Sequence, residues 1–110
     1  MIQDTLGQIE KRIKDAGNLN PDRQQELLGL VQTLRKELDA VPETHRDQAR
    51  SVAGFANIST HEAVRTDRDP KLLKLSLDGL AASVAEFETT HPRLAQIGNS
   101  ICNTLSNLGI

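Results

Sequence analysis

Glu88 and His91 have the spacing that metal sites in helical bundles use. Side chains three residues apart lie on one face of a helix, and di-iron carboxylate bundles combine two such Glu-x-x-His pairs with two further glutamates. This chain has one pair of that kind, and Pro92 follows it directly. Because proline suits the first turn of a helix and breaks one later, His91 is better explained as a helix cap. Glu88 and His91 are thus the metal candidates, although we expect a helix boundary there and no metal or other cofactor.

The other residues that could do chemistry are scattered. His45, His61 and His91 lack the local spacing of a metal site, and the single Cys102 excludes a zinc cluster of cysteine ligands. A nucleophilic thiol needs a base or a cation nearby, and the residues around Cys102 are uncharged. We expect Cys102 to be a small buried hydrophobic residue beside Ile101.

No arrangement for covalent or phosphate chemistry is evident either. Ser59, His61 and Asp67 could be drawn as a catalytic triad, but residues two apart on a helix do not face each other. A phosphate-binding loop needs clustered glycines, whereas the seven of this chain are isolated, at positions 7, 17, 29, 54, 79, 98 and 109. We therefore predict no catalytic and no cofactor-binding residues, and a protein that is not an enzyme.

Four prolines divide the chain into five segments, and apolar residues recur within the segments at helical spacing. Asn20 and Asp69 each stand directly before a proline, as a helix N-cap does when proline occupies the first turn. We predict helices over residues 2–16, 21–40, 44–65, 70–89 and 92–108. In the third of these, Gly54, Asn57 and Ile58 lower the helical propensity, and Ser59 begins a possible second capping box. These features allow a break near residue 57.

The predicted fold is all-α, an antiparallel bundle of four to five helices with coiled-coil-like apolar stripes, forming a single domain over residues 1–110. Only two residues are aromatic, and there is no Trp or Tyr. This composition suits interdigitated aliphatic side chains between helices better than a β-sandwich. Several topologies would bury the same stripes, so the order of the helices in the bundle stays open.

The last predicted helix is unusual because residues 94–110 contain no charged side chain, although 25% of the chain is charged. Apolar residues recur on one face, and the other faces are polar but neutral. Solvated helix faces usually carry charge, so we expect this helix to be covered on more than one side, by its own chain or by a second copy. The candidate interface consists of Phe87, Leu94, Ile97, Ile101, Leu105 and Leu108.

Three glycines stand where the lack of a side chain matters. Gly79 and Gly98 each interrupt an apolar helical pattern, at a cost of about 0.8–1 kcal/mol relative to alanine. Either another helix backbone approaches closely at these two points, or the glycines are merely tolerated. Gly109 fits a helix C-cap, after which Ile110 would fold back onto the apolar face.

Charge and hydropathy limit the partners. The 15 acidic and 13 basic residues give a net charge of −2 and are interspersed, so a nucleic acid would find no basic patch. No apolar run approaches the roughly 20 residues of a membrane span, and the amino terminus has no signal-peptide pattern. A lone cysteine fits a reducing compartment. We expect a cytoplasmic protein without membrane association, and we do not expect nucleic acid as its partner.

The carboxy-terminal part resembles a known family. The pattern FExxHPxLA, which begins at Phe87, and the closing LxxLGI, which begins at Leu105, are similar to those of a bacterial family of small helical proteins known only as a domain of unknown function. The resemblance is most specific over residues 72–110, and the segment 44–68 looks like an addition to it. It implies a bacterial, cytoplasmic protein, but no reaction, ligand or fold.

The leading functional hypothesis is a non-enzymatic interaction module that binds a second copy of itself, or another protein, through its fourth and fifth helices. Heptad-like stripes on several helices suggest more apolar surface than one small bundle covers. The alternative is a monomer whose five helices cover one another. The sequence makes no prediction about a small-molecule ligand.

Two further classes of function remain open. A metal-binding bundle or an enzyme would require four side chains to converge in space, namely Glu88, His91, His61 and Glu62. A nucleic-acid-associated regulator would use the arginines at 46, 50, 65 and 68. We rank it last, because acidic residues alternate with these arginines and leave little net field.

Overall fold

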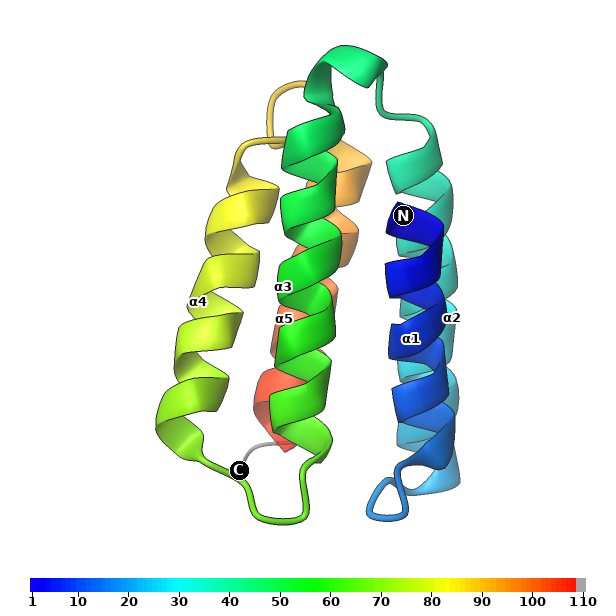
Figure 1. Cartoon of the computed structure of the whole chain (residues 1–110), viewed down its shortest axis with the longest axis vertical. Coiled ribbons are helices and arrows are strands. Elements are labelled where there is room, and N and C mark those ends of the chain that lie inside the picture. Colours follow the sequence, from blue (N-terminus) through cyan, green and yellow to red (C-terminus); the bar gives the residue numbers. More distant parts are fainter. Residues whose placement is uncertain (109–110) are drawn as a thin grey trace.

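Five α-helices and one turn of 3₁₀-helix form the chain, which a computed structural model describes over residues 1–108 (Figure 1). No strand occurs within that range, so the predicted all-α fold is confirmed. None of these described helices is both long enough and apolar enough to cross a lipid bilayer. The elements are α1 (Ile2–Asp15), α2 (Pro21–Asp39), η1 (Glu43–His45), α3 (Arg46–Val64), α4 (Pro70–Ala85) and α5 (Pro92–Leu108).

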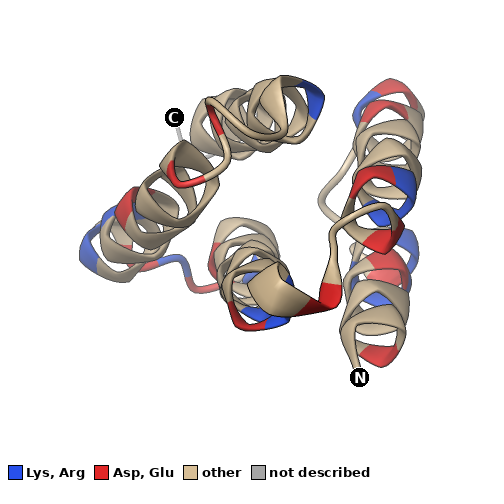
Figure 2. Cartoon of the chain, turned by 90° about the horizontal axis from the view of Figure 1, so that it is seen from above, with Lys and Arg blue, Asp and Glu red and all other residues tan. Residues whose placement is uncertain are grey.

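Helices that follow one another in sequence run antiparallel, as predicted (Figure 1). Their packing closes a ring in the order α1, α2, α5, α4, α3, and α3 also packs on α5. α2 contacts α1 and α5 rather than α3, and η1 carries the chain across the end of the bundle. Seen from above, α1 and α2 form one side of the molecule, α4 and α5 the other, and α3 lies between them (Figure 2).

The core consists mainly of aliphatic side chains. Leu6, Ile9 and Ile13 on α1 are fully buried, and so is Leu34 on α2. Phe87 is the one aromatic side chain within residues 1–108 that is fully buried. Burying a side chain of this size contributes roughly 1.5–3 kcal/mol, so the apolar stripes read from the sequence are what holds the helices together.

Side-chain caps fix two helix starts where the sequence predicted them. The Asn20 side chain accepts a hydrogen bond from the backbone N–H of Arg23 at 2.8 Å, at the start of α2. Asp69 accepts bonds from the N–H groups of Lys71 and Leu72 at 3.0 and 3.3 Å, at the start of α4. These bonds satisfy N–H groups that have no partner within the helix.

The break expected near residue 57 does not occur, because α3 runs from Arg46 to Val64 without interruption. Its inward face is an almost continuous row of small buried residues, which packs on neighbouring helices along its whole length. Ser59 lies inside the helix and caps nothing, and Asn57 bonds across to α1. Tertiary packing has overridden the weak local propensity. The start is also later than predicted, since residues 43–45 form the 3₁₀ turn.

α4 is shorter than predicted and ends at Ala85 rather than near residue 89. The N–H groups of Phe87 and Glu88 bond to the carbonyls of Val84 and Ala85, three residues back. This tighter pattern is common where a helix ends. The chain then turns into α5, which spans residues 92–108 as predicted.

Gly79 and Gly98 both mark close approaches, but to side chains rather than to a helix backbone. A Cβ atom on Gly79 would overlap the ring of Phe55, and one on Gly98 would overlap the side chain of Val84. Gly79 thus allows α3 to pack closely on α4, and Gly98 allows α4 to pack closely on α5. The predicted cap at residues 109–110 lies outside the described part of the chain.

Candidate functional site

Most of the interface predicted on the fourth and fifth helices is buried inside the chain itself. Phe87, Leu94, Ile101 and Leu105 are each at most 2% exposed, because α5 packs against α2, α3 and α4. The prediction that these four side chains meet another chain is therefore wrong. The remaining two, Ile97 and Leu108, are half-buried and pack against the same core.

The neutral polar face of α5 is open to solvent. Residues such as Gln96, Asn99 and Asn103 are exposed, so the chain covers only the apolar side of this helix. Arg93, near its beginning, is the only charged residue on α5 (Figure 2). The exposed face offers hydrogen-bonding groups but little apolar area, which makes it a poor basis for a stable contact.

The exposed apolar side chains gather elsewhere, on the outer side of α3 and α4. Leu75 is 67% exposed and Ile58 50% exposed, and Leu72 and Phe55 are also exposed. The Phe55 ring lies against Gly79, and the two helices run antiparallel side by side (Figure 1). One turn further along each helix, Ile58 and Leu75 are consequently neighbours. We call these four residues the α3–α4 surface.

Helical spacing in the sequence suggested a single apolar stripe on α4, whereas apolar residues lie on two faces of this helix. The core face includes Leu73, Leu80 and Val84, and buried serines complete it. A second row begins with Leu72 and Leu75 and continues at spacings of three and four through Gly79 and Ala82 to the charged Glu86, so its apolar part is its first half. A heptad-like row on an exposed face is typical of a helix that packs on a further helix, and this was the available signal.

The predicted metal candidates do not form a site. Glu88 is exposed in the turn after α4, and the His91 ring packs edge-on against Phe87 with the ring centres 5.6 Å apart. His61 and Glu62 lie near the opposite end of the bundle (Figure 1). Nowhere in residues 1–108 do three His, Cys, Asp or Glu side chains come together in a way that could hold a metal ion.

Cys102 is half-buried between α4 and α5, as a small hydrophobic residue would be. Its Sγ lies 4.0 Å from the carbonyl oxygen of Leu77. Burial raises the pKa of the Cys102 thiol to about 11, because a thiolate would lose hydration there. The thiol is therefore protonated at neutral pH and is a weak nucleophile.

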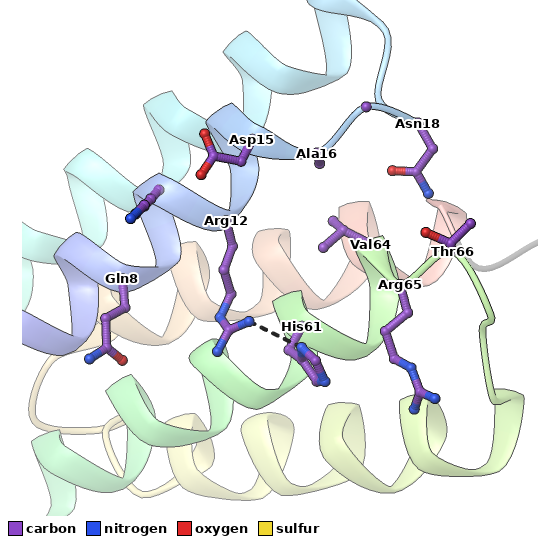
Figure 3. Close-up of a pocket in the computed structure, with 11 residues that line it drawn as sticks. Gln8, Arg12, Asp15, Ala16, Asn18, His61, Val64, Arg65 and Thr66 are labelled. Atoms are coloured by element: carbon purple, nitrogen blue, oxygen red, sulfur yellow. Dashed lines mark hydrogen bonds between the residues drawn. The ribbon is translucent and has the colours of Figure 1, made fainter.

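A pocket of about 700 Å³ opens between the carboxyl ends of α1 and α3 (Figure 3). Its wall combines the α1 residues Arg12 and Asp15 with the 16–18 turn, and His61 and Val64 come from α3. The residues are far apart in sequence, and sequence reasoning did not bring them together. The pocket and the α3–α4 surface adjoin on α3, because Ile58 and His61 are three residues apart, but His61 contacts α1 whereas Phe55 contacts α4.

Comparison with known protein families identifies the family of this chain. Residues 27–110 match the model of a family described as domain of unknown function DUF4404. The chain belongs to this family. The match confirms the resemblance to a domain of unknown function, and no curated protein and no solved structure matches the chain significantly.

The matched range bears on both candidate sites of this DUF4404 chain. It includes residues 44–68, so the segment expected to be an addition lies inside the family region. The whole α3–α4 surface also lies within it, whereas α1, with Arg12, precedes it.

Proposed function

We propose that this DUF4404 protein is a non-enzymatic interaction module that associates with a second copy of itself through the α3–α4 surface. The observation that carries the proposal is the side-by-side exposure of Phe55, Ile58, Leu72 and Leu75, while every other large apolar side chain within residues 1–108 except Met1 is at least partly buried. Contiguous apolar patches on soluble proteins commonly mark interaction sites.

A second copy fits because α4 is complementary to itself when reversed. Its first half presents Leu75 and the basic Lys71, its second half presents the small Ala82, and the acidic Glu86 follows its last residue directly. Two α4 helices packed antiparallel about a twofold axis would place Lys71 opposite Glu86 of the other copy. In the same register, Leu75 of each copy meets Ala82 of the other. A twofold interface makes each of these contacts twice.

Charge near the proposed axis is already balanced within one chain. Asp78 lies near the middle of this register, where it would approach its counterpart in the second copy. Lys74 Nζ lies 2.9 Å from Asp78 Oδ2 within the same helix, so the two carboxylates do not meet as bare charges. Charged residues then lie at the ends of the register, and the Leu75–Ala82 contacts lie between those ends and the balanced Lys74–Asp78 pairs at the centre.

Light scattering on a sizing column tests self-association directly. We expect a mass near twice 12.1 kDa for the wild type and a monomer for Leu75→Glu, since the new carboxylate would be buried against Ala82 of the other copy. Gln32→Glu adds the same side chain at an exposed position on α2 and should leave the mass unchanged. A wild type that stays monomeric at high concentration, or a Leu75→Glu variant that still dimerises, refutes the proposal.

Exchanging the charges of Lys71 and Glu86 distinguishes self-association from binding to a different protein. Lys71→Glu should weaken the dimer because it faces Glu86 of the other copy, and adding Glu86→Lys should restore it by rebuilding the opposite pair. If the partner were a different protein, Lys71→Glu would weaken its binding, and adding Glu86→Lys would not restore it.

The other functional classes have less support in the geometry. Three of the four arginines considered for nucleic acid, Arg46, Arg50 and Arg65, each contact a carboxylate of their own chain. As part of the proposal, we regard the protein as bacterial and cytoplasmic, on its family resemblance and its lone, reduced cysteine.

A further inference from the structure

We infer that the pocket between α1 and α3 binds a small organic anion, with its acidic group on Arg12 and its apolar part along Val64 and the 16–17 turn. The inference is independent of self-association, because it concerns α1 and the side of α3 that faces α1. It rests on how Arg12 is held, on the absence of a counter-charge to Arg12 within the described part of the chain, and on the shape of the space in front of Arg12.

Neutral side chains hold Arg12 in place. Its Nε donates to Asn57 Oδ1 at 3.1 Å, and its Nη1 lies 3.1 Å from His61 Nδ1. Asn57 is itself fixed, because its Nδ2 donates to Gln8 Oε1 at 3.1 Å. With Arg12 as the donor, Nδ1 of His61 is the unprotonated nitrogen. The network orients the guanidinium and leaves three of its five N–H donors without a partner in the described residues.

Among residues 1–108, no carboxylate serves as a counter-charge to Arg12. Six of the eight arginines lie within 4.0 Å of a carboxylate oxygen, and Arg12 is not one of them. Asp15 lines the same pocket, but its carboxylate points away from Arg12 (Figure 3). A fixed, uncompensated guanidinium is suited to bind a carboxylate or phosphate through two parallel hydrogen bonds.

The surroundings favour an anion with an apolar body. Lys11 supplies a second cation, whereas Arg65 is turned to Glu62, whose oxygen lies at 2.8 Å. The carboxyl ends of α1 and α3 both border the pocket and would repel an anion, but at α1 two carbonyls already accept bonds from Gln24 Nε2 at 3.0 Å. A volume of about 700 Å³ lies in the range of small-molecule sites.

Amide chemical shifts in a ¹H–¹⁵N NMR titration test this inference, with octanoate, octanol and inorganic phosphate as the probes. We expect octanoate to shift amides around Gln8, Arg12 and Val64, and to bind at least tenfold more tightly than octanol, which has the same chain without the charge. Phosphate alone should shift the same amides more weakly. Shifts at the α3–α4 surface instead, or equal binding of octanoate and octanol, would overturn the inference.

Two variants test whether Arg12 binds the acidic group of the ligand. Arg12→Gln should weaken octanoate binding by about tenfold or more, since it removes the charge-assisted bonds, whereas Arg93→Gln removes an exposed arginine on α5 and should not matter. If Arg12→Gln disturbs the fold, Lys11→Gln provides the second test, because Lys11 makes no ion pair in the described residues, and its loss should weaken binding severalfold. Unchanged binding in a folded Arg12→Gln variant, or in Lys11→Gln where Arg12→Gln does not fold, contradicts the inference.

Discussion

At the scale of single residues, glycines decide how closely two pairs of helices approach. Gly98 on α5 leaves room for the side chain of Val84, and a Cβ atom there would overlap it. Gly29 on α2 is also within a helix, but its added Cβ would meet open space. The two positions share the same helical propensity and differ only in packing, so they form a matched pair.

We predict that Gly98→Ala destabilises the protein by about 1–2 kcal/mol, because overpacking outweighs the gain in helical propensity. Gly29→Ala should instead stabilise it by up to about 1 kcal/mol. Urea unfolding followed by circular dichroism measures both free energies. Placing Gly98→Ala in a Val84→Ala background should remove most of its cost. An equal gain in stability from both single substitutions would contradict the assigned contact.

At the scale of helices, the prolines and their caps set the boundaries. We predict that Asn20→Ala lowers the free energy of unfolding by about 1 kcal/mol, because the N–H of Arg23 loses its acceptor. Asn18→Ala, two residues earlier in the same turn, changes an exposed side chain that caps nothing and should have an effect within about 0.5 kcal/mol. If the two variants unfold at the same urea concentration, the cap contributes nothing.

Local signals of this kind explain how far the sequence could predict the fold. Capped starts before Pro21 and Pro70 are properties of neighbouring residues, so α2 and α4 begin where expected. The continuity of α3 depends on helices that are distant in sequence. Its buried alanines pack on α1 and α4, and that burial outweighs the low propensity of Gly54 and Asn57.

The candidate sites depended on the arrangement of the helices, which the stripes alone did not determine. The stripe of α5 is covered by three helices of the same chain, and so the predicted interface became core. Leu72 and Leu75 belong to an exposed second row on α4, which is hard to distinguish from the core row before the neighbours are known. Arg12 and His61 meet only because α1 and α3 lie side by side.

At the scale of the whole molecule, the ring of five helices separates residues that hold the chain together from those proposed to join two chains. Leu105 on α5 is fully buried, so its environment exists within one chain. Leu75 on α4 is largely exposed, so its proposed environment exists only between chains. The same substitution, leucine to alanine, should therefore act through different equilibria at the two positions.

We predict that Leu105→Ala lowers the free energy of unfolding by about 2–5 kcal/mol at any protein concentration, because it leaves a cavity in the core. Leu75→Ala should cost little at low concentration. A dimer that unfolds to single chains gains stability with protein concentration, so the wild type and Leu105→Ala should melt at higher temperature when concentrated, and Leu75→Ala should show the smallest rise. Melting curves at low and high concentration decide the matter. If the melting temperature of the wild type does not change with protein concentration, the α3–α4 surface does not bind a second copy, even though α5 is buried as described.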